Sequence, residues 1–192
     1  MIFSPVSQLE IERKFIVPRE HQKLFVSRGG GTEIVQAYLT SDPSAQMRVR
    51  IAKDALGEKA TLTKKGPPSD DGLVRSEVEH SISVESAHAL MRTQEVPWLN
   101  KTRHSVRGPD GAEWAVDVLR VNRVAGRPPE MWRFLVLAEH EADSIEKVNS
   151  VALPDWVGTE VTNNPVFSMF ALTTESSRDA AWRIAYEIKK SK

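Results

Sequence analysis

Charged and apolar side chains alternate along several short segments, and this alternation limits which secondary structure each segment can form. In LEIERKF, Glu10, Glu12 and Lys14 would share one face of an extended strand, with mainly apolar residues on the other face. Charges spaced two residues apart recur in MRVRI, RSEVEHSI, KTRHSV and LAEHEA. A period of two is typical of β-strands, so the pattern predicts a chain dominated by strands.

Turn-rich stretches separate these segments and divide the chain into eight predicted strands. Examples are GGGT at 29–32 and KGPPSDDG at 65–72, which contain the glycine and proline residues typical of turns. The predicted strands cover residues 9–17, 34–40, 46–52, 59–65, 73–84, 100–106, 113–121 and 133–141. Because most of them follow one another directly along the chain, they favour an antiparallel sheet or barrel.

Helical periodicity is confined to a few connections and to the C-terminal part of the chain. We expect helices at 19–27, 85–93, 143–151 and about 176–190. The last segment has apolar residues at helical spacing and ends in lysines, which interact favourably with the carbonyl end of a helix. The pattern predicts one α+β domain spanning residues 1–192, with a C-terminal helix at about 176–190.

The composition excludes several classes of protein. The chain of 192 residues has 26 basic and 26 acidic residues, 40% apolar residues and no cysteine. A formal charge of zero argues against binding to nucleic acid or membranes through bulk charge, and the apolar content argues against disorder. Without cysteine there is no disulfide, thiolate metal site or cysteine nucleophile. The N-terminus does not resemble a signal peptide and no segment is long enough to span a bilayer, so we expect a cytoplasmic protein.

Repeated pairs of like charges are the feature that water-exposed strand faces do not explain. One such pair fits an ordinary solvated face, but this chain repeats the pairing on five predicted strands. Like charges on one strand face repel and need opposing partners, so we infer that the charged faces converge on one space. The predicted fold is therefore an eight-stranded antiparallel closed barrel, with a charged interior and with helices covering its apolar outer faces.

The two sets of inward charges have complementary chemistry. Arginine and lysine bind phosphate oxygens, the former through two parallel hydrogen bonds. The inward basic residues are Lys14, Arg48, Arg50, Lys65, Lys101 and Arg103. Carboxylates without histidine or cysteine ligands suit a hard cation such as Mg²⁺ or Mn²⁺. The inward acidic residues are Glu10, Glu12, Glu77, Glu79, Asp117, Glu139 and Glu141. Together they predict a metal-assisted polyphosphate site.

The ordered series of these motifs resembles the CYTH superfamily, the triphosphate tunnel metalloenzymes. EIERK at 10–14 resembles the ExExK signature of that family, and MRVRI resembles its arginine pair. ATLTKKG, RSEVEHSI and KTRHSV resemble its next conserved strands, which places the family lysine at Lys65. WAVDVL, LAEHEA and WVGTEVTNNP follow in the order of the family, so the resemblance spans about residues 9–170.

The resemblance implies hydrolysis or cyclisation of a triphosphate with Mg²⁺ or Mn²⁺. The residues it implies for substrate binding are Lys14, Arg48, Arg50, Lys65, Arg75, Lys101 and Arg103. The metal candidates it implies are Glu10, Glu12, Glu77, Glu79, Asp117, Glu139 and Glu141. The catalytic residues it implies are Glu10, Glu12, Lys14, Lys65 and Asp117. Two departures concern metal use, because Ala115, Asn163 and Asn164 stand where acids are common in the family.

Three functions are compatible with these motifs. The leading interpretation is a hydrolase of the bacterial-type inorganic triphosphatase branch, acting on inorganic triphosphate or on a nucleoside or thiamine triphosphate. A class IV-type adenylyl cyclase is less favoured, because those enzymes typically carry His-Phe-Glu-Arg-Lys where this chain has EIERK. A polyphosphate- or nucleotide-binding module would not need so many carboxylates. We expect a small-molecule triphosphate as the binding partner, and no binding to nucleic acid or membranes. A homodimer is compatible with the sequence.

Overall fold

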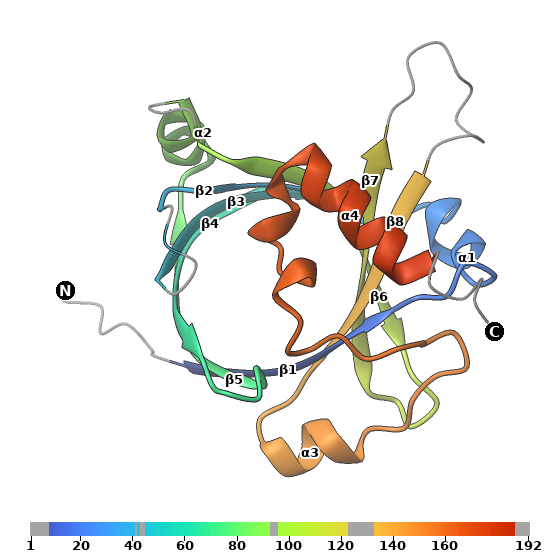
Figure 1. Ribbon diagram of the computed structural model, residues 1–192. Coiled ribbons are helices and arrows are strands. Elements are labelled where there is room, and N and C mark those ends of the chain that lie inside the picture. Colours follow the sequence, from blue (N-terminus) through green and yellow to red (C-terminus); the bar gives the residue numbers. More distant parts are fainter. Residues whose placement is uncertain (1–7, 41, 43–44, 93–95, 123–132, 187–192) are drawn as a thin grey trace.

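Eight antiparallel strands close into a barrel, which confirms the predicted fold (Figure 1). The computed structural model describes residues 8–40, 42, 45–92, 96–122 and 133–186. The strands are β1 (Gln8–Ile16), β2 (Thr32–Tyr38), β3 (Gln46–Asp54), β4 (Gly57–Pro68), β5 (Val74–Ile82), β6 (Trp98–Arg107), β7 (Glu113–Asn122) and β8 (Arg133–Glu141). Their order around the barrel is β1-β5-β4-β3-β2-β6-β7-β8, and β8 pairs with β1 to close it. Each of the eight predicted strands overlaps one of these.

The register between neighbouring strands sets opposite charges side by side. Lys14 lies opposite Glu139 between β1 and β8, and Lys65 lies opposite Glu77 between β4 and β5. Cross-strand pairs of opposite charge stabilise a sheet, whereas like pairs destabilise it. The interior of the barrel is therefore charged, as predicted, and most of its charges have partners.

Four α-helices and two short 3₁₀ helices connect or follow the strands in the described part of the chain. They are α1 (Lys23–Val26), α2 (Val84–Arg92), α3 (Ile145–Ser150), η2 (Pro165–Phe167), η3 (Ala171–Thr173) and α4 (Glu175–Tyr186). The helix predicted at 19–27 is confirmed only over α1, because turns occupy residues 19–22 and Gln22 makes no side-chain cap. The predicted end of the last helix, at 187–190, lies outside the described residues.

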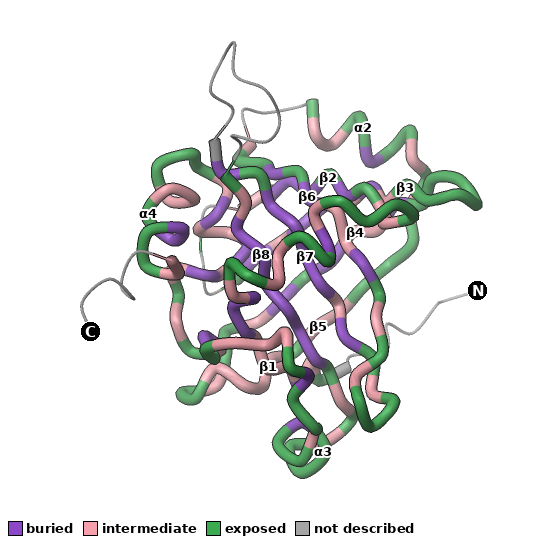
Figure 2. Tube along the Cα trace, turned by 90° about the vertical axis from the view of Figure 1, so that its right-hand side faces the viewer, coloured by how far each residue is buried: buried purple, intermediate pink, exposed green. Residues whose placement is uncertain are grey.

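Apolar side chains on the outside of the barrel are covered where helices and loops cross it. Phe15, Trp114 and Val116 pack with Phe25 of α1 and with Trp156. On the opposite strands, α2 packs its buried residue Ala87 against β3 and β4. Figure 2 shows long buried stretches along β7 and β8, whereas most of α2 and α3 faces water. This part of the prediction, apolar outer faces under helices, is confirmed.

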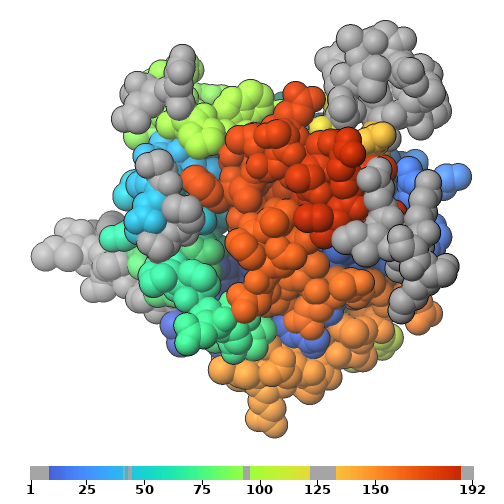
Figure 3. All heavy atoms as spheres, in the orientation of Figure 1, coloured from blue at the N-terminus to red at the C-terminus, as the bar shows by residue number. Residues whose placement is uncertain are grey.

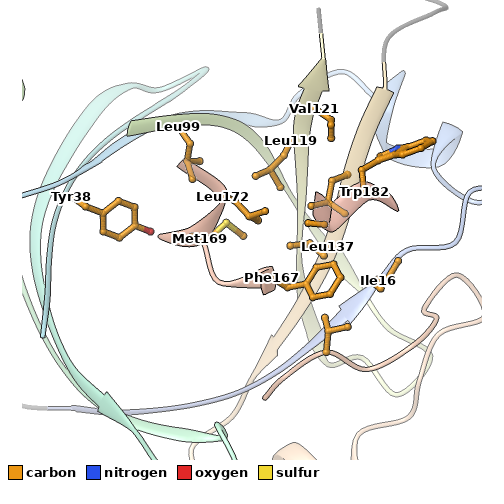
Figure 4. Close-up of a cluster of buried hydrophobic side chains, with 13 residues drawn as sticks. Ile16, Tyr38, Leu99, Leu119, Val121, Leu137, Phe167, Met169, Leu172 and Trp182 are labelled. Carbon is orange, nitrogen blue, oxygen red and sulfur yellow. The ribbon is translucent and has the colours of Figure 1, made fainter. Parts of the chain in front are cut away.

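One end of the barrel interior is apolar, which corrects the prediction of a charged interior throughout. Leu99, Leu119 and Leu137 lie two residues from Lys101, Asp117 and Glu139 on their strands, and so they share the inward face. The segment at 161–182 enters this end with its own apolar side chains, and the labelled residues of both sets point toward one another in Figure 4. Figure 3 shows the same segment lying across the centre of this face of the molecule. The charged cavity therefore occupies only the other end of the barrel interior.

Candidate active site

A cavity of about 790 Å³ occupies the charged half of the barrel. The charged residues that line it are Glu10, Glu12, Lys14, Arg48, Arg50, Lys65, Arg75, Lys101, Arg103, Glu113, Glu139, Glu141 and Asp143. Tyr38, Ser168 and Met169 line it where it meets the apolar end. Since six of the eight strands contribute predicted site residues to its wall, closure of the barrel creates the site.

Arginine side chains from β3 form the least neutralised part of the wall. The guanidinium Nε atoms of Arg48 and Arg50 are buried and have no hydrogen-bond partner among the described residues. Arg48 has carboxylates of Glu77 and Glu79 only at 3.9 Å. Burial, with repulsion from Arg48 and Arg103, lowers the pKa of Arg50 to about 10. Buried donors without acceptors are costly, so this wall is suited to an anion with many oxygens.

Asp117 of β7 holds two further cations from β6. Lys101 Nζ donates to its carboxylate at 2.7 Å, and Arg103 donates to both of its oxygens at 2.7 and 2.6 Å. Burial lowers the pKa of Lys101 to about 7, although the charge of Asp117 opposes this shift. Burial raises the pKa of Asp117 less than Arg103 and Lys101 lower it, so its carboxylate stays ionised. The effect is to fix both cations at the cavity wall.

Lys14 of β1 lies between two carboxylates, one of which, Glu139, also accepts from Arg103 at 2.6 Å. Its Nζ is 3.1 Å from Glu139 and 3.4 Å from Glu12. Burial opposes the charge of Lys14, but Glu12 and Glu139 outweigh burial and raise its pKa. Lys14 therefore carries a permanent positive charge within the acidic part of the cavity.

The acidic part has more negative charge than its lysines neutralise. Lys65 pairs with Glu10 and, at 2.8 Å, with Glu77, yet Glu10 Oε2 is buried without a hydrogen-bond partner. Glu12 and Glu141 lie directly opposite each other on β1 and β8. Burial raises the pKa of Glu141, and the charges of Glu10, Glu12 and Glu77 raise it further. Like charges in this arrangement destabilise a barrel unless a cation lies among them.

A divalent cation fits the donor chemistry of this acidic part, because carboxylate oxygens are the ligands that Mg²⁺ and Mn²⁺ prefer. Glu10 Oε2, which has no hydrogen-bond partner among the described residues, is available as such a ligand. Within the described residues, no three acidic or histidine side chains converge closely enough to hold an ion as they stand. Glu12 is instead paired with Lys14, and Glu10 is paired with Lys65.

All the site residues predicted from the sequence line the cavity except Glu77, Glu79 and Asp117. These three accept hydrogen bonds from cavity cations or from the adjacent Thr63. Ala115 lines the cavity, so the missing acid at that position does change its wall. Asn163 instead donates to the carbonyl of Asp70, and Asn164 accepts from the amide of Val166, outside the cavity wall.

Some lining residues were not predicted. Glu113 lies two positions before Ala115 on the inward face of β7, so the two-residue period could have identified it. Tyr38 also shares the inward face of its strand, but it lies in an apolar segment that carries no charge pair. Ser168 and Met169 come from an irregular segment, and no local pattern indicates that it enters a barrel.

The fold and the site together define a class of protein. It consists of closed antiparallel barrels in which basic side chains suited to phosphate line one part of the interior and acidic side chains suited to a metal ion line another. No family profile matches the chain. Two inorganic triphosphatases are similar to it. That of Acetivibrio thermocellus is 32% identical over 157 residues, which are 81% of this chain and 87% of the relative. That of Nitrosomonas europaea is 30% identical over 163 residues, or 85% and 95% of the two chains.

A crystal structure of an inorganic triphosphatase has a similar fold, with a TM-score of 0.51 and 28% identity over 85% of this chain and 93% of the other. The chain therefore belongs to the CYTH superfamily of triphosphate tunnel metalloenzymes, in its bacterial-type inorganic triphosphatase branch. None of the described helices is long and apolar enough to cross a membrane.

Proposed function

We propose that this protein hydrolyses triphosphate compounds with the help of a divalent metal ion. The observation that carries the proposal is the pair of buried Nε donors of Arg48 and Arg50 that lack acceptors, in a cavity whose acidic part has more negative charge than its lysines neutralise. An anion and a cation bound together would satisfy both walls. The names of the two relatives support inorganic triphosphate as the first substrate to test. Nucleoside and thiamine triphosphates present the same phosphate groups and remain candidates.

The basic residues would bind the phosphate chain. Arg48 and Arg50 can each donate two hydrogen bonds to phosphate oxygens. Arg103 donates from Nε and Nη2 to Asp117 and Glu139, so Nη1 is the nitrogen it offers to phosphate, and Lys65, Arg75 and Lys101 add positive charge. Asp117 supports this arrangement through its hydrogen bonds to Lys101 and Arg103. Most of the catalysis would come from positioning and electrostatic stabilisation, as is usual in phosphoryl transfer.

The acidic residues would hold the metal and orient the attacking water. Glu10 and Glu12 are the first candidates to bind Mg²⁺ or Mn²⁺, with Glu77, Glu79, Asp117, Glu139 and Glu141 as further candidates. The ion would offset the negative charge that develops on the phosphate oxygens. Glu141 is exposed in the cavity wall beside them, where its carboxylate can accept a hydrogen bond from the attacking water. Attack by the water oxygen on the terminal phosphorus breaks the bridging P–O bond, so that inorganic triphosphate and water give phosphate and diphosphate, the latter as leaving group.

Two alternative functions predict different products. A class IV-type adenylyl cyclase would convert ATP to cyclic AMP and pyrophosphate, and a binding module would give no product. The relatives named inorganic triphosphatase do not favour either. The full chain should be incubated with triphosphate, ATP and thiamine triphosphate, each with Mg²⁺, Mn²⁺ or EDTA, and the products identified. Release of phosphate that EDTA abolishes is the expected result.

Substitution of the two acidic residues of the first motif tests the site. Glu10→Ala and Glu12→Ala should each lower metal-dependent turnover by about 100-fold or more, because each removes a proposed metal ligand. Arg50→Ala should mainly raise KM for triphosphate, because it removes a phosphate contact. Glu58→Ala is the matched control, since Glu58 pairs with Lys53 on the exposed hairpin between β3 and β4. Near-normal turnover in both glutamate variants would contradict the assignment.

A further inference from the structure

The GTEVT segment of the sequence, residues 158–162, continues the barrel where β5 ends. β5 pairs with β1 only over Gln8–Ile11, so the same edge of β1 is open beyond that point. The GTEVT segment pairs with this edge: the amide of Ile16 donates to Thr159 O at 2.9 Å, and that of Gly158 donates to Ile16 O at 2.9 Å. The open edge carries Lys14. The function proposed above does not use this segment.

Both backbone groups of Lys14 are bound by the GTEVT segment. The amide of Val161 donates to Lys14 O at 2.7 Å. The amide of Lys14 donates at 3.1 Å to the side-chain oxygen of Thr162 and not to a carbonyl. A threonine hydroxyl thus takes the place of a backbone acceptor at the residue whose ammonium group lies between Glu12 and Glu139.

The orientation of the Thr162 hydroxyl is determined by Glu160. Thr162 donates its proton to Glu160 Oε1 at 2.6 Å, which leaves its oxygen lone pairs for the amide of Lys14. Arg13 holds the Glu160 carboxylate by donating from Nε at 3.0 Å and from Nη2 at 2.6 Å. An ionised carboxylate can only accept, so the direction of each bond in this chain is defined. Arg13 is the neighbour of Lys14 on the other face of β1.

We propose that Thr162 is a positioning residue for Lys14, and that Glu160 and Arg13 act through it. The inference rests on the proposed function, because it assigns Lys14 to the triphosphate site. Loss of the hydroxyl would leave the Lys14 amide without its acceptor and would allow β1 to shift at this residue. A small displacement of a phosphate-binding group has a large effect on rate, because the reaction depends on positioning.

The test compares three variants of the full chain, two of which remove one threonine hydroxyl group and one of which keeps it. Thr162→Val removes the acceptor and keeps the shape, and Thr162→Ser restores a hydroxyl. Thr40→Val is the matched control: Thr40 accepts from the amide of Met47 at 3.0 Å and donates to Ala45 O at 2.9 Å. It follows β2, which lies on the opposite side of the barrel from β1, the strand of Lys14. We expect kcat/KM for triphosphate to fall about tenfold in Thr162→Val, and to stay near the wild-type value in the other two.

A second readout does not depend on activity. With ¹⁵N-lysine labelling, amide exchange at Lys14 should accelerate in Thr162→Val and stay slow in Thr40→Val. Glu160→Gln, which keeps the shape of the side chain but removes its charge, should lower kcat/KM less than Thr162→Val does. It takes the place of Thr162→Val in the comparison if that variant does not fold. The inference is overturned if Thr162→Val equals Thr40→Val in both readouts, or if serine does not rescue. Wild-type protein that does not hydrolyse any triphosphate would instead contradict the proposed function.

Discussion

Individual charged residues of the cavity differ in how completely their neighbours neutralise them. Asp117 is fully buried and bound by two cations, whereas Arg48 and Arg50 keep buried donors without acceptors. A satisfied buried ion pair contributes mainly to structure, and an unsatisfied donor is available to a ligand. The same residue type therefore has different roles at positions that look equivalent in the sequence.

Asp117→Asn tests the structural role of this carboxylate. The variant keeps the shape but removes the charge that holds Lys101 and Arg103, so the buried Lys101 loses its carboxylate partner and Arg103 keeps only Glu139. The free energy of unfolding should fall by about 3 kcal/mol or more, and KM for triphosphate should rise. Urea unfolding and steady-state kinetics measure the two effects. Glu58→Gln, in an exposed pair, should change stability by less than about 0.5 kcal/mol, and equal effects in the two variants would be contrary to this view.

At the scale of elements, α4 is attached to the barrel by its last described turn. The hydroxyl of Tyr186 donates to Val17 O at 3.1 Å and accepts from the amide of Val136 at 3.3 Å, so it joins β1 and β8. Trp182, one turn earlier, packs its ring 4.4 Å from the Arg133 guanidinium. A helix docked by a buried hydroxyl is sensitive to ionisation of that hydroxyl.

The attachment of α4 should weaken at alkaline pH. Burial raises the pKa of Tyr186 to about 12, above its ordinary value of about 10 in the unfolded chain. A raised folded-state pKa of an acid gives stability that is complete below pH ~10 and is lost as the pH rises through ~12. Wild type should therefore lose roughly 2–3 kcal/mol relative to Tyr186→Phe over this interval. Urea unfolding at several pH values tests this, and parallel pH profiles for the two proteins would refute it.

At the scale of the whole molecule, side chains of the C-terminal segment pack into the apolar end of the barrel. The cluster that includes Phe167 and Leu172 joins the C-terminal segment to inward residues of β6, β7 and β8. Because side chains of the segment are buried in the end of the barrel, it should not unfold separately while the barrel remains closed. We therefore expect the filled end and the charged cavity to unfold as one cooperative structure.

Leu172→Ala should destabilise the entire barrel. Leu172 is completely buried, and its truncation leaves a cavity that typically costs about 2–5 kcal/mol. Trp fluorescence and far-UV circular dichroism should still report one midpoint in urea, since the transition is cooperative. Leu24→Ala, at a position 54% exposed, serves as the control and should cost less than about 0.5 kcal/mol. Two separate midpoints would show that the C-terminal segment unfolds independently.

Much of this architecture could be predicted from local patterns. The two-residue period located the strands, because it depends only on the alternation of neighbouring side chains. It also grouped the cavity residues, since charges such as Arg48 and Arg50 share one face of a strand. It could not predict that Leu137 and Glu139, which share the inward face of β8, would lie in different halves of the barrel.

The sequence by itself determined the eight strands, the inward face of the charged strands and the two sets of charges, because these follow from residues close together in the chain. Only the tertiary structure decided which carboxylate pairs with which cation, since that depends on the register between strands. It also decided that the C-terminal segment fills one end and that Thr162 contacts Lys14. The contact of Thr162 with Lys14 joins residues 148 positions apart, and no local periodicity encodes it.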